Sequence, residues 1–176
     1  MKKIITIIFC LLVSTTMAFA QHLVDFKGVN LDNDLAYFAE QMESKGFKFQ
    51  KNDTEDKYVI MQGVVYGKTR DVNIYYTPKT LKVWKVIVCL DDEISKEERI
   101  KLYNTTKREF KDYIIDEDPT KHTWTLDFGE YGLIAFMCNM VEYYDTVDES
   151  VEASNIVTYV DGINRTVWLE EEYGIK

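Results

Sequence analysis

The sequence predicts an α+β fold in which two helices pack on a largely antiparallel sheet. Three observations lead to this prediction: two segments with apolar residues at helical spacing, several short segments rich in Val, Ile and Tyr, and short polar breaks between the latter. Hydrophobic residues make up 46% of the 176-residue chain, enough for one core, and the 2 Pro and 8 Gly leave no long linker. We therefore expect one domain over residues 21–176, preceded by a separate segment over residues 1–20.

Residues 1–20 have the pattern of a secretory signal peptide. Lys2 and Lys3 form a positive start, residues 4–17 are apolar apart from Ser and Thr, and Ala18-Phe19-Ala20 places small residues at a cleavage site. The uninterrupted apolar run is shorter than the roughly 20 residues that span a bilayer, and no basic cluster follows it, so a membrane anchor is the weaker interpretation. We expect cleavage between Ala20 and Gln21, export to the periplasm or the medium, and no membrane span in the mature chain.

The first helix is expected to begin at Asp32 or Asn33 and to end at Gly46. Its apolar residues share one helical face: Leu35, Phe38, Ala39 and Met42. Strands are expected next at 47–50, 58–66, 72–77 and 81–90, and their short polar connections favour an antiparallel meander.

The second helix has the clearest start in the chain. Ser95 and Glu98 form a capping box, in which each side chain can bond the backbone amide of the other residue. The helix must stop before Pro119, and we expect its end within Asp116-Glu117-Asp118-Pro119. Strands are expected at 123–128, 132–141 and 155–160, and the tail at 163–173 fits either a strand or a short helix.

Each predicted helix is followed by a set of strands, the order expected of a duplicated helix-plus-meander unit. That order is similar to the architecture of tandem-repeat inhibitor folds of the β-lactamase-inhibitor type. The resemblance concerns architecture alone and implies no activity, because one fold can host many functions.

A second resemblance covers most of residues 21–176. Its marks are Phe26-Lys27-Gly28-Val29-Asn30-Leu31-Asp32, Lys45-Gly46-Phe47, Met61-Gln62-Gly63 with Gly67, and Tyr159-Val160-Asp161-Gly162-Ile163-Asn164. These motifs are similar to landmarks of uncharacterised secreted proteins of Bacteroidetes-type bacteria. The resemblance implies an extracytoplasmic α+β domain, and no catalytic residue can be carried over from it.

The charge balance argues against nucleic acid as a partner. The chain has 21 basic and 30 acidic residues, a net charge of −9, and loss of Lys2 and Lys3 with the signal peptide makes it more acidic. A chain of that charge is repelled by phosphate backbones and by anionic lipid surfaces.

Common catalytic and cofactor motifs are absent from the sequence. No serine stands in G-x-S-x-G, and neither H-E-x-x-H, C-x-x-C nor a glycine-rich phosphate loop occurs. Carboxylates are so numerous that no single pair points to a glycosidase. We therefore expect no cofactor, no metal site and no catalytic residue.

Two cysteines, Cys89 and Cys138, follow the signal segment. Export would make a disulfide between them chemically possible. Both lie in strand-like apolar runs, where reduced cysteine is a common small hydrophobic residue. We favour two buried thiols and keep the disulfide as the alternative.

Trp124 and Trp168 are the candidate binding residues, because exposed aromatic rings bind sugars and partner proteins. Trp84 alternates with Val86 and Val88 and is expected in the core instead. Separately, Asp145-Thr146-Val147 is similar to the acceptor for O-glycosylation of exported proteins in Bacteroidetes-type bacteria. That similarity makes Thr146 a candidate glycan site.

These observations favour an exported, non-enzymatic binding protein whose partner is a protein or a glycan. The alternative is a small cell-envelope hydrolase that acts on glycan or peptide. A hydrolase should show a concave pocket that contains an acid or base with a perturbed pKa, whereas a binding module should show an exposed aromatic or apolar patch.

We predict that the intact mass of the exported protein begins at Gln21, with or without cyclisation to pyroglutamate. Mass spectrometry of the protein from its own host checks this. A mass that retains residues 1–20, or that carries an added lipid, would contradict the signal peptide.

Overall fold

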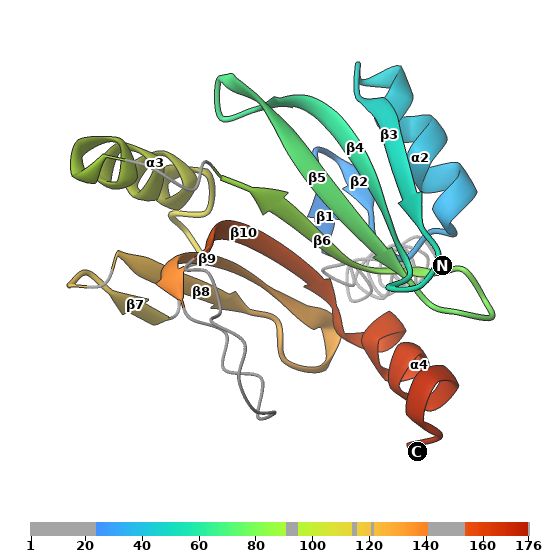
Figure 1. Ribbon diagram of the computed structural model, residues 1–176. Coiled ribbons are helices and arrows are strands. Elements are labelled where there is room, and N and C mark those ends of the chain that lie inside the picture. The colour runs from blue at the N-terminus through green and yellow to red at the C-terminus, as the bar shows by residue number, and fades with distance from the viewer. Residues whose placement is uncertain (1–23, 91–94, 114–115, 121, 141–153, 176) are drawn as a thin grey trace, which may run out of the picture.

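The fold is seen in a computed structural model that describes residues 24–90, 95–113, 116–120, 122–140 and 154–175, with side chains at all of these except 138–140 and 154–155. Within this part of the chain lie three α-helices, a two-stranded hairpin and an eight-stranded antiparallel sheet (Figure 1). The predicted α+β class is confirmed. No helix among the described residues is long and apolar enough to cross a membrane.

The first half of the chain follows the predicted order of one helix and a meander. A short hairpin, β1 (Asp25–Phe26) and β2 (Val29–Asn30), precedes helix α2 (Leu35–Ser44). The meander then consists of β3 (Lys48–Asp53), β4 (Tyr58–Val65), β5 (Lys68–Tyr76) and β6 (Val83–Cys89). Alternating burial along β4 and β5 shows that each of these strands has one face in the core.

The second half repeats this order and adds a last helix. Helix α3 (Lys96–Glu109) is followed by β7 (Asp116–Asp118), β8 (Thr123–Asp127), a 3₁₀ turn at Gly129–Tyr131, β9 (Gly132–Met140) and β10 (Ser154–Asp161). Helix α4 (Gly162–Tyr173) forms the end of the fold. Of the two structures that the sequence allowed for residues 163–173, strand or short helix, the helix is the one observed.

The two halves of the chain contribute to the sheet in the same way, each with one helix followed by a four-stranded meander. The sheet runs β3-β4-β5-β6-β10-β9-β8-β7, so each half contributes four consecutive strands, and the last strands of the halves, β6 and β10, pair at the centre. Val88 pairs with Val157 and Val86 with Tyr159 in this central ladder. The two halves are therefore joined by backbone hydrogen bonds as well as by side-chain packing.

The two edge strands are blunted. In β3 the register shifts between Phe49 and Lys51, and most of the strand is exposed. At the other edge, β7 is three residues long and wholly acidic. Bulges, charges and short length all oppose the pairing of an edge strand with another chain.

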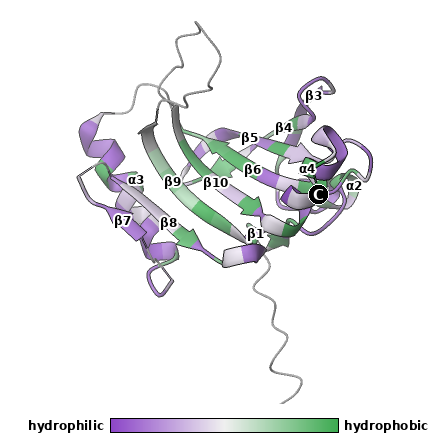
Figure 2. Cartoon of the chain, turned by 90° about the horizontal axis from the view of Figure 1, so that it is seen from below, coloured by the Kyte–Doolittle hydropathy of each residue, from purple (hydrophilic) through white to green (hydrophobic). Residues whose placement is uncertain are grey.

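The core lies on one face of the sheet, under α2, α3 and the β1–β2 hairpin. The hairpin places Phe26 edge-on against Phe47, with ring centroids 6.0 Å apart, and against Tyr159 of β10 at 5.1 Å. Helix α2 adds Phe38 and Met42 to this core, and α3 adds Leu102 and Tyr103; all four side chains are buried. Figure 2 shows the matching colours: hydrophobic stretches on β6, β9 and β10, and a mostly hydrophilic α3.

Helix α4 is fixed at its start by two buried polar side chains. Asp161 caps the helix by accepting a hydrogen bond from the Asn164 amide at 2.7 Å. The Asn164 side-chain amide donates to the carbonyl oxygens of Val83 at 2.8 Å and Leu31 at 3.4 Å. Burial raises the pKa of the Asp161 carboxyl above its ordinary value, because the hydrogen bonds from the helix amides compensate only part of the desolvation.

Two glycines allow the backbone to pass closely beside this cap. A Cβ on Gly132 would lie 1.9 Å from the carbonyl oxygen of Val160, and one on Gly162 would lie 2.2 Å from that of Glu130. The obstructing atoms are backbone atoms, so neither residue could gain a side chain without a shift of the chain. The Asp161-Gly162-Ile163-Asn164 motif singled out in the sequence is thus explained by local packing.

Two helix boundaries differ from the prediction. The N-cap of α2 is Asp34, not Asp32 or Asn33, because Asp34 has the extended backbone needed to accept from the Tyr37 amide at 3.0 Å. Helix α3 starts at the predicted cap, where the Ser95 hydroxyl accepts from the Glu98 amide at 3.1 Å. It ends at Glu109, earlier than Pro119 requires, and residues 116–118 form β7 instead.

We predict that Asn164→Ala lowers the free energy of unfolding by about 1–3 kcal/mol, because two buried carbonyl oxygens lose their donor. Urea unfolding of the variant checks this. Arg165→Ala, at the exposed neighbouring position, is the control and should change stability by no more than about 0.5 kcal/mol. Equal effects of the two substitutions would contradict the role given to Asn164.

Candidate functional site

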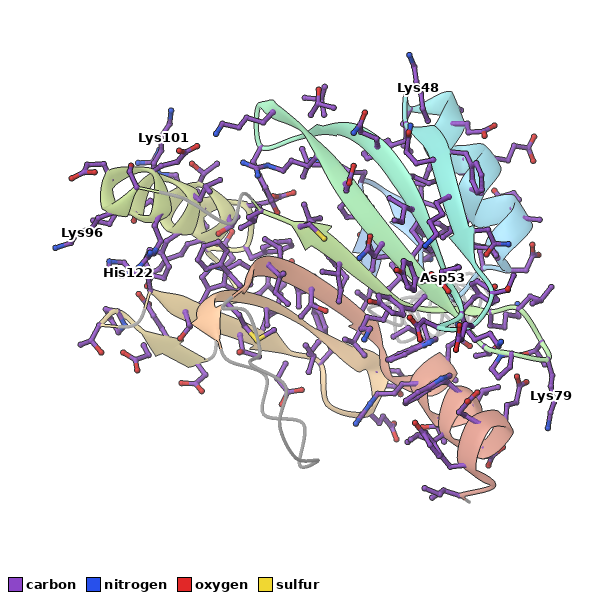
Figure 3. All side chains as sticks on the ribbon, in the orientation of Figure 1. Lys48, Asp53, Lys79, Lys96, Lys101 and His122 are labelled. Carbon is purple, nitrogen blue, oxygen red and sulfur yellow. The ribbon has the colours of Figure 1, made fainter. Side chains whose placement is uncertain are left out.

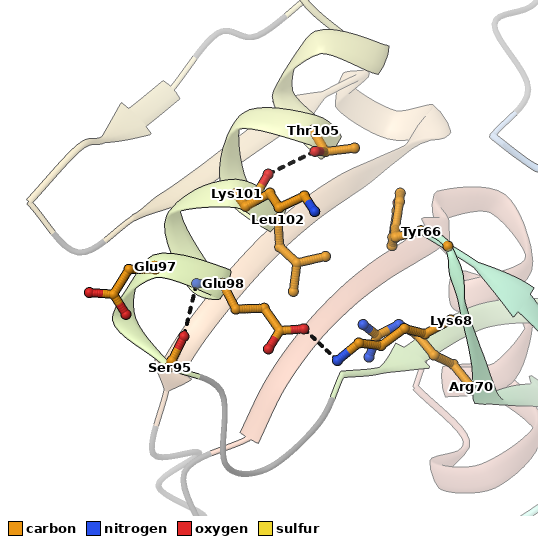
Figure 4. A pocket seen from close by; sticks show the side chains of 10 residues that line it. Tyr66, Lys68, Arg70, Ser95, Glu97, Glu98, Lys101, Leu102 and Thr105 are labelled. Carbon is orange, nitrogen blue, oxygen red and sulfur yellow. Dashed lines mark hydrogen bonds and ion pairs between the residues drawn. The ribbon is translucent and has the colours of Figure 1, made fainter.

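A cleft of about 480 Å³ opens between the N-terminal half of α3 and the turn that joins β4 to β5 (Figure 4). Its size falls in the range of small-ligand sites. Strand β5 and the turn supply one wall and α3 supplies the other. The lining consists of Tyr66, Gly67, Lys68, Arg70, Ser95, Glu97, Glu98, Lys101, Leu102 and Thr105.

An ion pair crosses the mouth of the cleft. Lys68 of β5 pairs with Glu98 of α3, and the dashed line in Figure 4 marks this contact. The two side chains are 47% and 34% exposed. Because both are well solvated, the pair contributes only about 0–1 kcal/mol to stability. It can therefore open and exchange its partners at little cost.

Arg70 is the buried cation of the cleft. It is 3% exposed, and its Nε donates to the Val65 carbonyl oxygen at 3.2 Å. Lys68 and Arg70 stand two residues apart on β5, so both side chains lie on the same face of the strand. The anchored guanidinium gives the floor of the cleft a fixed positive charge.

Tyr66 forms an aromatic wall in an unusual backbone conformation. Its φ is +51° and that of Gly67 is +78°, as in the two-residue turns that match the twist of a hairpin. A left-handed conformation is unfavourable for a residue with a large side chain, and such strain concentrates at functional positions. The ring is held in place, because its hydroxyl lies 3.1 Å from that of Tyr159.

The chemistry available to the Tyr66 hydroxyl is limited by its surroundings. Burial raises the pKa of this phenol well above its ordinary value, and the hydrogen bond to Tyr159 offsets only part of the effect. Burial also raises the pKa of Tyr159. Both phenols therefore stay protonated at physiological pH and serve as neutral hydrogen-bonding groups.

The α3 wall combines a fixed framework with one long cation. The Ser95 hydroxyl is occupied as the helix cap, and the Thr105 hydroxyl donates to the Lys101 carbonyl oxygen at 2.7 Å. Leu102 is buried and supplies apolar surface. Lys101 is exposed and lines the cleft from α3 (Figure 4). The cleft lining contains neither His nor Cys.

Trp124, one of the two predicted binding residues, lies in the core, so its prediction as an exposed ring was wrong. It is 1% exposed, stacks parallel to Phe136 at a centroid distance of 6.4 Å, and lies 5.5 Å from Phe110. Its indole nitrogen donates to the Thr106 hydroxyl at 3.1 Å. This satisfied polar atom lets the whole ring be buried, and it fixes α3 on the sheet.

Trp168, the other predicted binding residue, is half-buried and attaches α4 to the sheet. It stacks on Trp84 at 4.4 Å with an interplanar angle of 14°, and Tyr173 meets it edge-on at 5.5 Å. The pairing of Trp84 with Trp168 buries Trp84, as the sequence predicted. Lys85 extends the cluster, with its ammonium 4.6 Å from the Trp84 ring centre and 4.0 Å from that of Tyr75.

The far end of α4 is also tied to the sheet. Glu171 accepts hydrogen bonds from the backbone amides of Lys79, at 2.6 Å, and Thr80, at 3.2 Å, in the turn between β5 and β6. Partial burial favours the neutral carboxyl, but these amides outweigh it, and the pKa of Glu171 lies below its usual value. The contacts of Trp168 and Glu171 thus serve to attach α4, and the ring surface left for a ligand is small.

Of the other predicted positions, Ala20, Gln21 and Thr146 lie outside the described residues, as does the side chain of Cys138. Cys89 is half-buried on β6, so its predicted burial is met only in part, and its pairing with Cys138 and the burial of Cys138 stay predictions. His122 stands edge-on to Tyr103, with ring centroids 5.6 Å apart (Figure 3).

Among the described residues, no group of three or more His, Cys, Asp or Glu side chains could hold a metal ion. A smaller hollow of about 190 Å³ lies between the end of α3 and the sheet and is lined mainly by apolar residues such as Phe110 and Leu126. The larger cleft is the better candidate site because charged groups of both signs converge on it.

Sequence reasoning missed the cleft residues for a simple reason. The one local signal for a site is the Tyr66-Gly67 turn just before Lys68 and Arg70. Two cations on one strand, however, most often belong to a solvent-exposed face. Only the packing of α3 brings Lys101 and Leu102 opposite them. The prediction looked instead for exposed tryptophans.

Comparison of the chain with protein-family models, with curated proteins and with solved structures finds no match in any of the three.

We predict that Trp168→Ala lowers the free energy of unfolding by about 1–3 kcal/mol, because it removes half-buried aromatic surface that anchors α4. Tyr173→Ala, which truncates a ring that is 62% exposed, should cost under about 1 kcal/mol. Thermal and urea unfolding check both. If Trp168→Ala left stability unchanged and weakened ligand binding, Trp168 would be a surface contact as first predicted.

Proposed function

We propose that this protein is an exported, non-enzymatic binding protein whose ligand occupies the cleft between α3 and the β4–β5 turn. The observation that carries the proposal is the convergence of fixed polar groups and apolar walls on one ligand-sized cavity. The ligand is a small molecule or a segment of a protein or glycan partner that fits this volume.

The attachment of the cleft walls supports a role in recognition. Leu102 is buried beneath α3, and Trp124 bonds Thr106 one turn further along the helix, so this wall is fixed to the sheet. Tyr66 is held by Tyr159, and Arg70 by the Val65 carbonyl. Walls that are fixed before the ligand arrives lower the entropy cost of binding.

The lining groups also suit binding better than hydrolysis. The Ser95 hydroxyl is used as a cap, and the buried Tyr66 phenol is a weak acid. A hydrolase would need one of these groups to take or give a proton at the reacting atom.

Export is proposed from the sequence. Lys2, Lys3, the apolar residues 4–17 and the Ala18-Phe19-Ala20 pattern support a cleaved signal peptide. A periplasmic or secreted location follows from it, and the motif resemblance to secreted proteins of Bacteroidetes-type bacteria agrees with that location.

We predict that Thr105→Trp, which places a bulky ring in the cleft, abolishes ligand binding while the fold is retained. The measurement is a fragment screen by ¹H–¹⁵N NMR with neutral, cationic and anionic compounds, followed at the amides of Gly67, Lys68 and Leu102. Asn104→Trp, at the exposed neighbouring position of α3, is the matched control and should bind like the original protein.

Two outcomes would contradict the proposal. One is a set of fragment hits that leaves the cleft amides unchanged and gathers at another surface. The other is turnover of peptidoglycan or a polysaccharide by the purified protein, abolished by a single Asp or Glu substitution, which would identify a hydrolase.

A further inference from the structure

Three cations meet in the cleft of a chain that is acidic as a whole. The net charge of the protein is −9, yet Lys68, Arg70 and Lys101 line one cavity, against the two carboxylates of Glu97 and Glu98. Lys68 and Arg70 come from β5, and Lys101 comes from the opposite wall. Cations that converge from two elements create a local positive potential within an otherwise negative surface.

We infer that the cleft binds an organic anion, a carboxylate or phosphate group carried on an apolar stem, with the anionic group between Lys68 and Lys101 and the stem against Tyr66 and Leu102. The inference rests on the proposed function, because it names the ligand class of that same cleft. Carboxylate and phosphate share the chemistry that an ammonium recognises, namely charged oxygen acceptors.

The Glu98 carboxylate contacts Lys68 in the way that the anionic group of the ligand would. This contact is solvated. An incoming anion can replace that carboxylate, and Lys68 then exchanges one counter-charge for another. The competition has a testable consequence: removal of the Glu98 charge must strengthen anion binding.

The remaining cation and the walls define where the rest of the ligand lies. Lys101 and Leu102 line the cleft from α3, and Tyr66 lines it from the β4–β5 turn. A ligand whose anionic group binds a lysine of the cleft therefore has apolar surface of the Tyr66 ring and the Leu102 side chain within the same cavity. An aromatic or aliphatic body fits these surfaces better than a second polar group, because apolar contact removes their surface from water.

The experiment titrates the exported protein with benzoate, phenyl phosphate, inorganic phosphate, benzyl alcohol and benzylamine, and follows the amides of Gly67, Lys68 and Leu102 by NMR. Benzoate, phenyl phosphate or both should shift these amides, more strongly than inorganic phosphate alone. Benzyl alcohol and benzylamine should leave them unchanged. The comparison of benzoate with phenyl phosphate separates a carboxylate ligand from a phosphate ligand.

Three variants sharpen the result. Lys101→Met should weaken binding of the anionic probe about tenfold or more, as expected for the loss of one charge-assisted hydrogen bond. Lys96→Met, which removes an exposed lysine of the same helix that points to a different side, should change it less than about twofold (Figure 3). Glu98→Gln should tighten binding several-fold, a gain that damage to the fold cannot produce.

The inference is overturned if neither anionic probe shifts the cleft amides, or if Glu98→Gln weakens binding as much as Lys101→Met does. If benzyl alcohol or benzylamine binds there in preference to the anions, the cleft remains a binding site and the proposed function stands without this ligand class. Loss of all binding at the cleft, including every fragment of the wider screen, removes the proposed function as well.

Discussion

The buried side chain of Asn164 joins three segments that are far apart in the sequence. Its amide bonds the carbonyl oxygens of Leu31, just after the β1–β2 hairpin, and of Val83, at the start of β6. Its own backbone amide is capped by Asp161 at the end of β10. The hairpin, the two central strands and α4 are thus placed relative to one another by one residue. The close approach of the chain at Gly132 and Gly162 is possible only in that arrangement.

The walls of the cleft are supported by residues of the β1–β2 hairpin and of β10. The Phe26 ring packs on Tyr159 of β10, and the Tyr159 hydroxyl in turn lies against that of Tyr66. On the other wall, Trp124 bonds Thr106 and keeps α3 in position. Both walls are therefore supported by buried contacts, whereas the charged groups that meet the solvent, such as Lys68 and Glu98, are held weakly. A rigid frame with exchangeable charges at its mouth suits recognition of a charged ligand.

The parts of the fold that follow local patterns could be predicted from the sequence. Richness in Val, Ile and Tyr located β4, β6 and the second part of β5, and the Ser95 capping box located the start of α3, because these signals lie within a few residues of one another. The first four residues of β5, which include Lys68 and Arg70, were expected in a break between strands. The cap of α2 was misplaced because Asp32, Asn33 and Asp34 are all capable residues. Asp34 has the extended backbone of an N-cap where it forms a β-bridge with Lys82, a residue far away in the sequence. Trp124 was misassigned for a related reason, since its partner Thr106 belongs to another element. No local pattern could bring α3 and the β4–β5 turn together to form one cleft.

The pairing of β6 with β10 affects how the chain folds. Val88 pairs with Val157, so the centre of the sheet can form only when almost the whole chain is present. Contacts between residues so far apart in sequence form slowly, because the entropy of closing a long loop is lost before the contacts compensate it. Until then the first half presents β6 as an open edge with alternating valines, the kind of strand that recruits other chains. A fragment that ends before β10 (Ser154–Asp161) would keep this edge exposed and would therefore be prone to aggregation.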